Sequence, residues 1–445
     1  MLKNNIKTIM RIILYSLSNL YILLVGLFIR RDKRIVLFGA WMGEKYADNS
    51  RFLFQYLTQN KEKYNLKKVI WVTRNHEVNQ NLLDNGFESY IIGTKESNYW
   101  HLKSGIHIMC NMAAQSGKHR PDIDVRLSTG AKKIQLWHGV GIKAVGAKSN
   151  DSANGQKNQR SQWMVNFANL KSIRRIGFLG GWGEPKLLCT SELNKKINLG
   201  NSKIHLENAF ISAYPRYCEC TYLLDPEKEV IQRISKYKLS ILYLPTFRDG
   251  ESSFVHPTSD EAFLSFLKER GILWIQKPHQ ADKNRESFYK NDCVLNLNAD
   301  FDINSILHAV SVIVSDYSSA AFDSIYLEKP VIMYVPDLDE YMNGPNGLLM
   351  DLRDLCPSLL AMNQNELIKA IEETLDGTYF NDTRNEILKR MRKDFFSNRT
   401  VDYNMIWKDI TLLELQRFIV QLLMNITKKQ INVVLMVKTE LLNQR

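Results

Sequence analysis

Cysteine is scarce in this chain, and its spacing matches neither a disulfide framework nor a metal site. Six of the 445 residues are cysteine, and only Cys218 and Cys220 lie close together. No second pair stands at a zinc-like spacing, so the pattern is typical of reduced thiols in a cytosolic protein. Internal repeats and low-complexity tracts are also lacking, which argues against a solenoid or a disordered chain.

Arginine-rich tracts and nucleic-acid-binding motifs are absent as well, although the chain is basic. Its formal net charge is +12, which indicates an anionic partner: nucleic acid, an acidic membrane face or a phosphorylated substrate. Because no basic tract or motif supports the first of these, nucleic acid is the weakest of the three. We therefore expect no nucleic-acid partner.

A long hydrophobic run occurs only near the N-terminus. Residues 9–29 are rich in Ile, Leu, Tyr and Val, but Arg11 and the polar residues 16–19 interrupt them. No small-residue cleavage site follows, so a signal peptide is not expected. We predict that residues 1–34 form a helix in the cytoplasmic membrane surface, held by anionic lipid. A true span and a buried core helix are the alternatives. The basic residues that flank the run are Lys3, Lys7, Arg30, Arg31, Lys33 and Arg34.

The rest of the chain reads as a globular α/β protein with more than one core. Apolar content is 44% and charged content 24%, and 445 residues exceed what one core usually holds. Strand-like runs alternate with helical stretches, which predicts doubly wound parallel sheets. We expect two Rossmann-like domains, at 35–220 and 221–400, and a helical segment at 401–445. The expected strands are 35–38, 69–72, 90–92, 106–109 and 133–137, then 241–244, 272–275, 294–297, 310–314 and 330–335.

The stretch from Val312 to Asp323 is the central unit of the second set of predicted strands and helices. An apolar strand ends in the hydroxyl-rich turn 315–319, and a helical pattern follows at once. Free backbone N–H groups at a helix N-terminus, beside two serine hydroxyls, predict an anion site. The alternative is that Asp316 or Ser318 merely caps the helix, as these residue types commonly do.

Unusual polar residues recur where predicted strands end. His138 follows a strand in the first set; Thr246 with Arg248, and Lys277 with His279, follow strands in the second. Ligands of open α/β sheets bind beyond these carboxyl ends, so two facing sheets would bring the residues together across a cleft. Arg248, Lys277 and the helix terminus would then form a phosphate-binding wall.

Histidines are more often structural than catalytic, and we expect that for His101 and His308. His138 differs because Gly139 and Gly141 follow it and permit close backbone approach.

At these positions the chain resembles the CDP-glycerol glycerophosphotransferase family of teichoic-acid and capsule polyol-phosphate transferases. The resemblance covers roughly residues 35–400. It lies in five blocks taken in order, with further likeness at 47–50 and 334–341. The blocks are Trp137-His138-Gly139 with Lys143 and Gly146, Tyr214-Pro215-Arg216, Pro245-Thr246-Phe247-Arg248, Lys277-Pro278-His279, and Ser315-Asp316-Tyr317-Ser318-Ser319 with Phe322-Asp323.

The resemblance implies a two-domain fold of the GT-B type in which the C-terminal domain holds the nucleotide. It further implies that His138 is the base, with His279 as a second catalytic residue that contacts the donor's diphosphate together with Arg248. The other residues expected on the donor side are Thr246, Lys277, Asp316, Ser318, Ser319 and Asp323, and those on the acceptor side are Gly139, Lys143 and Arg216. Val140-Gly141, Ala213 and Tyr217-Cys218 depart from the family pattern, so the identity of the acceptor is less determined than the class of donor.

The expected reaction is attack by an acceptor hydroxyl on the β-phosphorus of a CDP-polyol, with release of CMP. His138 would take the hydroxyl proton, and Arg248, His279, Ser318 and Ser319 would stabilise the charge on the phosphates. We expect no cofactor and no bound metal, since Asp337 and Asp339 read as a loop charge pair.

We expect glycerol phosphate as the transferred group and a lipid-linked or glycan acceptor. A sugar-transferring GT-B enzyme, a single-addition primase and a non-catalytic binding module remain open.

Overall fold

The structure is a computed structural model of residues 1–445. Residues Met1–Val401 form one compact unit and Asp402–Arg445 a second. The residues that the structure describes are 10, 14, 17, 20–22, 24, 25, 28–111, 120–143, 185–201, 208–246, 254, 256–277, 292–298, 300–344 and 347–411.

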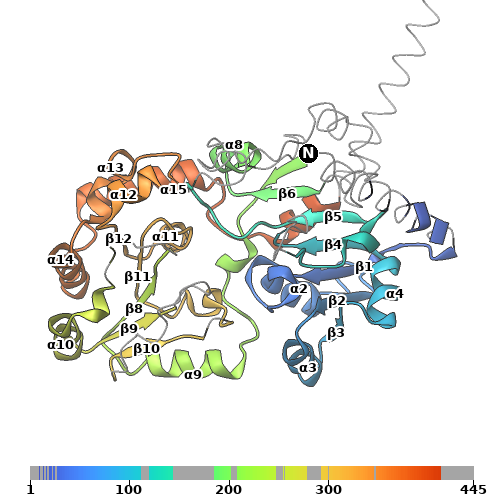
Figure 1. The fold of residues 1–445 in the computed structure, drawn as a ribbon, viewed down its shortest axis with the longest axis horizontal. Helices are drawn as coiled ribbons and strands as arrows, with labels where there is room; N and C mark the ends of the chain where they lie inside the picture. Colours follow the sequence, from blue (N-terminus) through green and yellow to red (C-terminus); the bar gives the residue numbers. More distant parts are fainter. Residues whose placement is uncertain are drawn as a thin grey trace, which may run out of the picture. The chain divides into compact units, whose positions relative to one another are not determined.

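The first unit contains two parallel sheets, which the chain builds one after the other (Figure 1). The first sheet has seven strands in the order β3-β2-β1-β4-β5-β6-β7, and every described pairing is parallel. The order reverses between β1 and β4, which is the switch point of a Rossmann-like sheet. The strands are β1 Asp32–Gly39, β2 Lys68–Thr73, β3 Glu88–Ile91, β4 Ser104–Met109, β5 Lys132–Gln135, β6 Lys186–Cys189 and β7 Ala209–Ile211.

The second sheet repeats this plan with six strands in the order β10-β9-β8-β11-β12-β13. Its pairings are also parallel, and its switch point lies between β8 and β11. Strands β8, β9 and β11 are buried along their whole length, as sheets covered on both faces require. The strands are β8 Leu239–Leu244, β9 Ile272–Gln276, β10 Val294–Asn296, β11 Val312–Ser315, β12 Val331–Tyr334 and β13 Leu360–Ala361.

Among the described residues, α-helices lie between most consecutive strands, as parallel crossovers demand, and short 3-10 helices lie between β4 and β5 and between β10 and β11. Helix α14 illustrates the local signals: Asn363 accepts a hydrogen bond from the Glu366 backbone at 3.0 Å, and Gly377 follows its end with φ 74°. The helices are α2 Asp48–Gln59, α3 His76–Asp84, α4 Lys95–Lys103, α8 Glu192–Asn201, α9 Asp225–Ile234, α10 Glu261–Arg270, α11 Ala320–Tyr326, α12 Leu338–Asn343, α13 Leu352–Leu355, α14 Gln364–Leu375 and α15 Asp382–Phe395.

The prediction of two Rossmann-like α/β sheets is confirmed, and each of the ten expected strands coincides with an observed one. The domain boundaries at residues 220 and 400 stay a prediction. In the second unit, the described residues from 403 to 411 are helical, and the Asp402 carboxylate accepts hydrogen bonds from the backbone of Asn404 and Met405.

The predicted membrane helix is described only at scattered positions. Within the described part of the chain, no helix combines the length and apolar character that crossing a bilayer requires. The described positions of 10–28 are helical, and most expose large apolar side chains. These exposed residues are Met10, Leu14, Leu17, Leu20, Tyr21, Leu24 and Phe28.

Arg31 corrects one part of that prediction, which counted it among the lipid-binding basic residues. Its guanidinium donates five hydrogen bonds of 2.7–3.1 Å to backbone carbonyls of His101, Ser104, Leu127 and Thr129. Burial lowers the pKa of Arg31 to about 10. The side chain therefore joins the start of β1 to the first sheet and does not face an anionic lipid.

Candidate functional site

A cavity of about 280 Å³ lies where the two sheets face each other at their switch points. Trp41, Lys45 and Asp48, which follow β1, line it from the first sheet. Pro245 follows β8 and Ser318 follows β11, and both line it from the second. This is the position at which doubly wound sheets bind ligands. Its other polar lining residues are His138, Arg216, Lys277, Asp302, Asn304, Ser319 and Asp323.

His138 reaches this cavity because the chain turns sharply after β5. Trp137 adopts φ 62°, and its indole stacks on the imidazole with ring centroids 4.7 Å apart. Asn49 of α2 fixes the turn by donating to the Trp137 carbonyl at 3.0 Å. The His138 side chain is half-buried, and desolvation lowers its pKa below 6.5. At neutral pH the imidazole is therefore uncharged and able to accept a proton.

Gly139 brings the His138 turn into direct contact with the second sheet's half of the unit. Its φ is 155°, and a Cβ built on it would lie 2.6 Å from the Ser319 Cβ. No side chain fits there without moving Ser319. The glycine is thus required by close approach as well as by its backbone conformation.

Arg216 is a buried clamp that ties three elements together. One terminal nitrogen donates to Asp48 Oδ1 and to the His138 carbonyl, each at 2.9 Å. The other terminal nitrogen donates to both Asp323 oxygens, at 2.6 and 2.8 Å. The pairs join α2, the His138 turn and α11, which come from both halves of the unit. Arg216, predicted on the acceptor side, therefore holds the cavity together, and protein groups engage both of its terminal nitrogens.

A second buried arginine repeats this arrangement. Arg51 of α2 donates to Glu227 of α9 at 2.5 and 2.7 Å, and approaches Asp302 at 3.4 Å. Asp302 in turn accepts from the Asp48 backbone at 3.2 Å. Because buried charges are retained only when they are paired, the two networks fix how α2 meets the second sheet's half.

Thr246 and Asp316 lie together at the ends of β8 and β11. Asp316 accepts from the Thr246 backbone at 2.8 and 3.0 Å and from its hydroxyl at 2.7 Å. Lys143 donates to the Thr246 hydroxyl at 2.9 Å. The structure thus places Lys143, predicted on the acceptor side, against two residues predicted on the donor side. All three organise the rim of the second sheet.

Ser318 and Ser319 line the cavity from the start of α11. The Ser318 hydroxyl accepts a hydrogen bond from the Ala320 backbone at 3.4 Å, so part of the predicted capping role is present. Helix α11 has only seven residues, and its dipole is correspondingly small. The serine hydroxyls and backbone N–H groups, rather than the dipole, are the groups that suit an anion here.

Two lysines supply positive charge to the cavity. Lys277, at the end of β9, donates to the Phe301 carbonyl, and burial together with the nearby Lys45 lowers its pKa to about 8. Lys45 lies 3.6 Å from Asp300. Two ammonium groups that are brought together while partly desolvated favour a polyanionic ligand.

The residues that line the cavity include Trp41, Lys45 and Asp48, which were not predicted as site residues. They follow the end of β1, which lies at the switch point of the first sheet, and that position is the signal that could have indicated them. Arg248 and His279, which were predicted, lie outside the described residues.

The loop pair Asp337 and Asp339 is engaged by protein groups: Tyr317 donates to Asp337 at 2.9 Å, and Arg353 pairs with Asp339.

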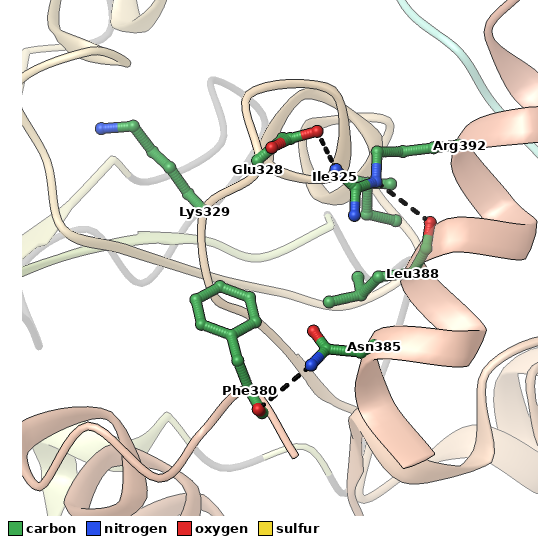
Figure 2. A pocket seen from close by; sticks show the side chains of 7 residues that line it. All are labelled: Ile325, Glu328, Lys329, Phe380, Asn385, Leu388 and Arg392. Carbon is green, nitrogen blue, oxygen red and sulfur yellow. Dashed lines mark hydrogen bonds and ion pairs between the residues drawn. The ribbon is translucent and has the colours of Figure 1, made fainter. Parts of the chain in front are cut away.

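Figure 2 shows a second hollow, of about 220 Å³, between the end of α11 and α15. Its charged groups are already paired. Glu328 forms an ion pair with Arg392, and the Lys329 ammonium donates to the carbonyls of His308 and Val310 at 2.7 and 2.5 Å. We therefore assign the functional site to the cavity between the sheets.

The chain is similar to known proteins over most of its length. The model of the family described as CDP-Glycerol:Poly(glycerophosphate) glycerophosphotransferase matches residues 21–399. The chain is 24% identical over 385 residues to a teichoic acid poly(glycerol phosphate) polymerase of Bacillus spizizenii, covering 84% of this chain and 91% of that protein. It is 26% identical over 387 residues to a teichoic acid glycerol-phosphate transferase of Staphylococcus aureus, covering 84% and 90%.

Among solved structures, the wall teichoic acid polymerase TagF superposes with a TM-score of 0.61 at 18% identity, covering 93% of this chain and 98% of that chain. The likeness shows a shared fold. Together with the family match over most of the sequence, it leads to one conclusion: the chain belongs to the CDP-glycerol:poly(glycerophosphate) glycerophosphotransferase family.

Proposed function

We propose that the protein transfers glycerol phosphate from CDP-glycerol to a hydroxyl of a lipid-linked or glycan acceptor, in teichoic-acid or capsule-type polymer synthesis. One observation carries the proposal: a single cavity joins the half-buried imidazole of His138 to the hydroxyls of Ser318 and Ser319 and to the ammonium of Lys277. A proton acceptor opposite a group of anion-binding donors is what phosphoryl transfer to a hydroxyl requires.

The residues divide between the two substrates as follows. Ser318, Ser319 and Lys277 bind the diphosphate of the donor and stabilise the charge that develops on it. His138 takes the proton of the acceptor hydroxyl as its oxygen attacks the β-phosphorus. The bond between that phosphorus and the CMP oxygen breaks, a phosphodiester forms and CMP leaves. Arg248 and His279 belong to the same proposal, on the donor side, from the family resemblance alone.

The test is a panel of donors offered to the purified protein with membranes as acceptor. We expect CMP release from CDP-glycerol, because lysine and serine side chains that suit an anion line the cavity and the relatives named above act on glycerol phosphate. Preference for CDP-ribitol would revise the polyol. Release of a nucleoside diphosphate from a sugar nucleotide would instead make the protein a glycosyltransferase, and no release from any donor would make it a binding module. The mass of the product separates one added unit, as from a primase, from a chain.

We further propose that the N-terminal helix holds the protein on the cytoplasmic membrane face. The exposed apolar side chains at 17, 24 and 28 support this, since apolar groups on a helix gain free energy by entering the lipid interface. In vesicle flotation with anionic lipid, we expect the full chain to float and the triple variant Leu17→Glu, Leu24→Glu, Phe28→Glu to stay behind. Leu83→Glu is the matched control, because Leu83 is an exposed leucine on α3. Equal flotation of all three proteins would contradict the proposal.

A further inference from the structure

Asp48 has a backbone and a side chain that local structure does not explain. It is the first residue of α2 and adopts φ 63°, in the left-handed region that is costly for residues other than glycine. The residue is 1% exposed. Its Oδ1 accepts from Arg216 at 2.9 Å and from the Asn49 backbone at 2.7 Å. Its Oδ2 is buried and has no hydrogen-bond partner among the described residues.

His138 also has a buried polar atom. Its Nδ1 has no hydrogen-bond partner in the described part of the chain. Both side chains line the same cavity, and the His138 carbonyl shares one Arg216 nitrogen with Asp48 Oδ1, at 2.9 Å each. Asp48 Oδ2 is a carboxylate oxygen that can accept a hydrogen bond, and His138 Nδ1 is a ring nitrogen that can donate one. Buried polar atoms rarely stay unpaired, so the two are natural partners.

We propose that Asp48 is a positioning residue for His138, and that its Oδ2 accepts a hydrogen bond from Nδ1–H when substrates occupy the cavity. The proposal rests on the transfer reaction proposed above. Arg216 already holds the Asp48 carboxylate and the His138 backbone close together, because one of its nitrogens donates to both.

The pairing determines which nitrogen does the chemistry. With its hydrogen on Nδ1, the ring keeps Nε2 bare, and Nε2 takes the proton of the acceptor hydroxyl as the new oxygen–phosphorus bond forms and CMP leaves with the electrons of the broken bond. The imidazolium that results is stabilised by the adjacent carboxylate. Burial lowers the pKa of His138, and the Asp48 carboxylate, together with a hydrogen bond to the Cys110 backbone, opposes that change.

Other charged groups around the imidazole set the background. Arg216 opposes protonation of His138, and Asp323, Asp302, Lys45 and Lys277 line the cavity beyond it. Arg216 Nε is also buried without a partner in the described residues. A contact from Arg216 Nε to Asp48 Oδ2 is the structural alternative, and it predicts no change in the pH dependence of the reaction.

The first experiment is the pH profile of Asp48→Asn, which keeps the shape and removes the charge. We expect kcat to fall at least about tenfold and the acid limb of kcat/KM for the acceptor to move down by about one pH unit or more. The KM for CDP-glycerol should stay unchanged. Asp323→Asn is the matched control, because it removes an equal charge from Arg216 but both of its oxygens are already bonded. An unmoved acid limb, or an equal movement in Asp323→Asn, would overturn the proposal.

The second experiment needs no variant at position 48 and no turnover. Imidazole ¹⁵N spectra of the wild-type protein saturated with CDP-glycerol report which ring nitrogen of each histidine carries hydrogen, and His138→Gln identifies the signal. We expect the Nδ1–H form; the Nε2–H form would refute the pairing even if Asp48→Asn fails to fold. Absence of CMP release from CDP-glycerol would refute the proposed function instead, so the two failures are distinguishable.

Discussion

Replacing His138 with alanine should lower the rate of CMP release from CDP-glycerol by about 10²–10⁴-fold, the usual contribution of a general base. The reason is that the imidazole, kept uncharged by burial, lines the cavity and is the proposed acceptor of the proton of an attacking hydroxyl. Binding of CDP-glycerol should change little, because the proposed donor contacts come from the second sheet. Initial rates of CMP release, with the dissociation constant measured by calorimetry, test both statements.

The matched control is His308→Ala. His308 is exposed, and its Nε2 contacts the Tyr217 carbonyl at 3.0 Å, so it is a histidine with a structural partner outside the lining of the cavity. Its replacement should leave the rate of CMP release near that of the wild type. If His138→Ala and His308→Ala behaved alike, His138 would not be the base.

Replacing Arg216 with methionine should be among the most destabilising single changes in the chain. It would leave the carboxylates of Asp48 and Asp323, 1% and 2% exposed, without their counter-ion. Removing one partner of a buried pair costs about 3–5 kcal/mol, because the remaining charge stays desolvated. We expect a clearly lower thermal unfolding midpoint by calorimetry and loss of activity, since the His138 carbonyl loses its donor too.

Arg353→Met is the control for the loss of an arginine–aspartate pair in itself. Arg353 pairs with Asp339 at the surface, where both side chains are largely exposed, and exposed pairs contribute little to stability. Its unfolding midpoint should match that of the wild type. An unchanged midpoint in Arg216→Met would show that the buried network does not hold the two halves.

Most strands could be predicted because buried parallel strands have apolar, β-branched sequences. Each expected run coincides with an observed strand. The strands that were not predicted are short: β6, β7 and β13 have four, three and two residues. Length alone does not separate them, because β10 has three residues and β11 has four, and both were predicted. β7 and β13 are edge strands and β6 lies next to β7, so these strands depend on pairing with a neighbour, which local sequence does not encode.

The cavity was predictable in outline for a related reason. Residues that follow strands of a parallel sheet meet at one edge, so His138, Lys277 and Ser318 could be grouped without a structure. The partners of Arg216 could not. Asp48 and Asp323 lie 168 and 107 positions from Arg216 in sequence. These side chains are buried because the two halves of the unit pack together, and such long-range contacts leave no local sequence pattern. The sequence therefore predicted the ends of the strands well and the buried contacts between the halves poorly.

Gly139 has a practical consequence for studying this enzyme family. With hydrogen in place of a side chain, it lets the imidazole turn touch the serine loop directly. Side chains of increasing size at this position would displace Ser319 by increasing amounts and would widen the spacing between the His138 turn and the serine loop. The rates of such a series would show how strongly the reaction depends on the spacing between the His138 turn and the serine loop.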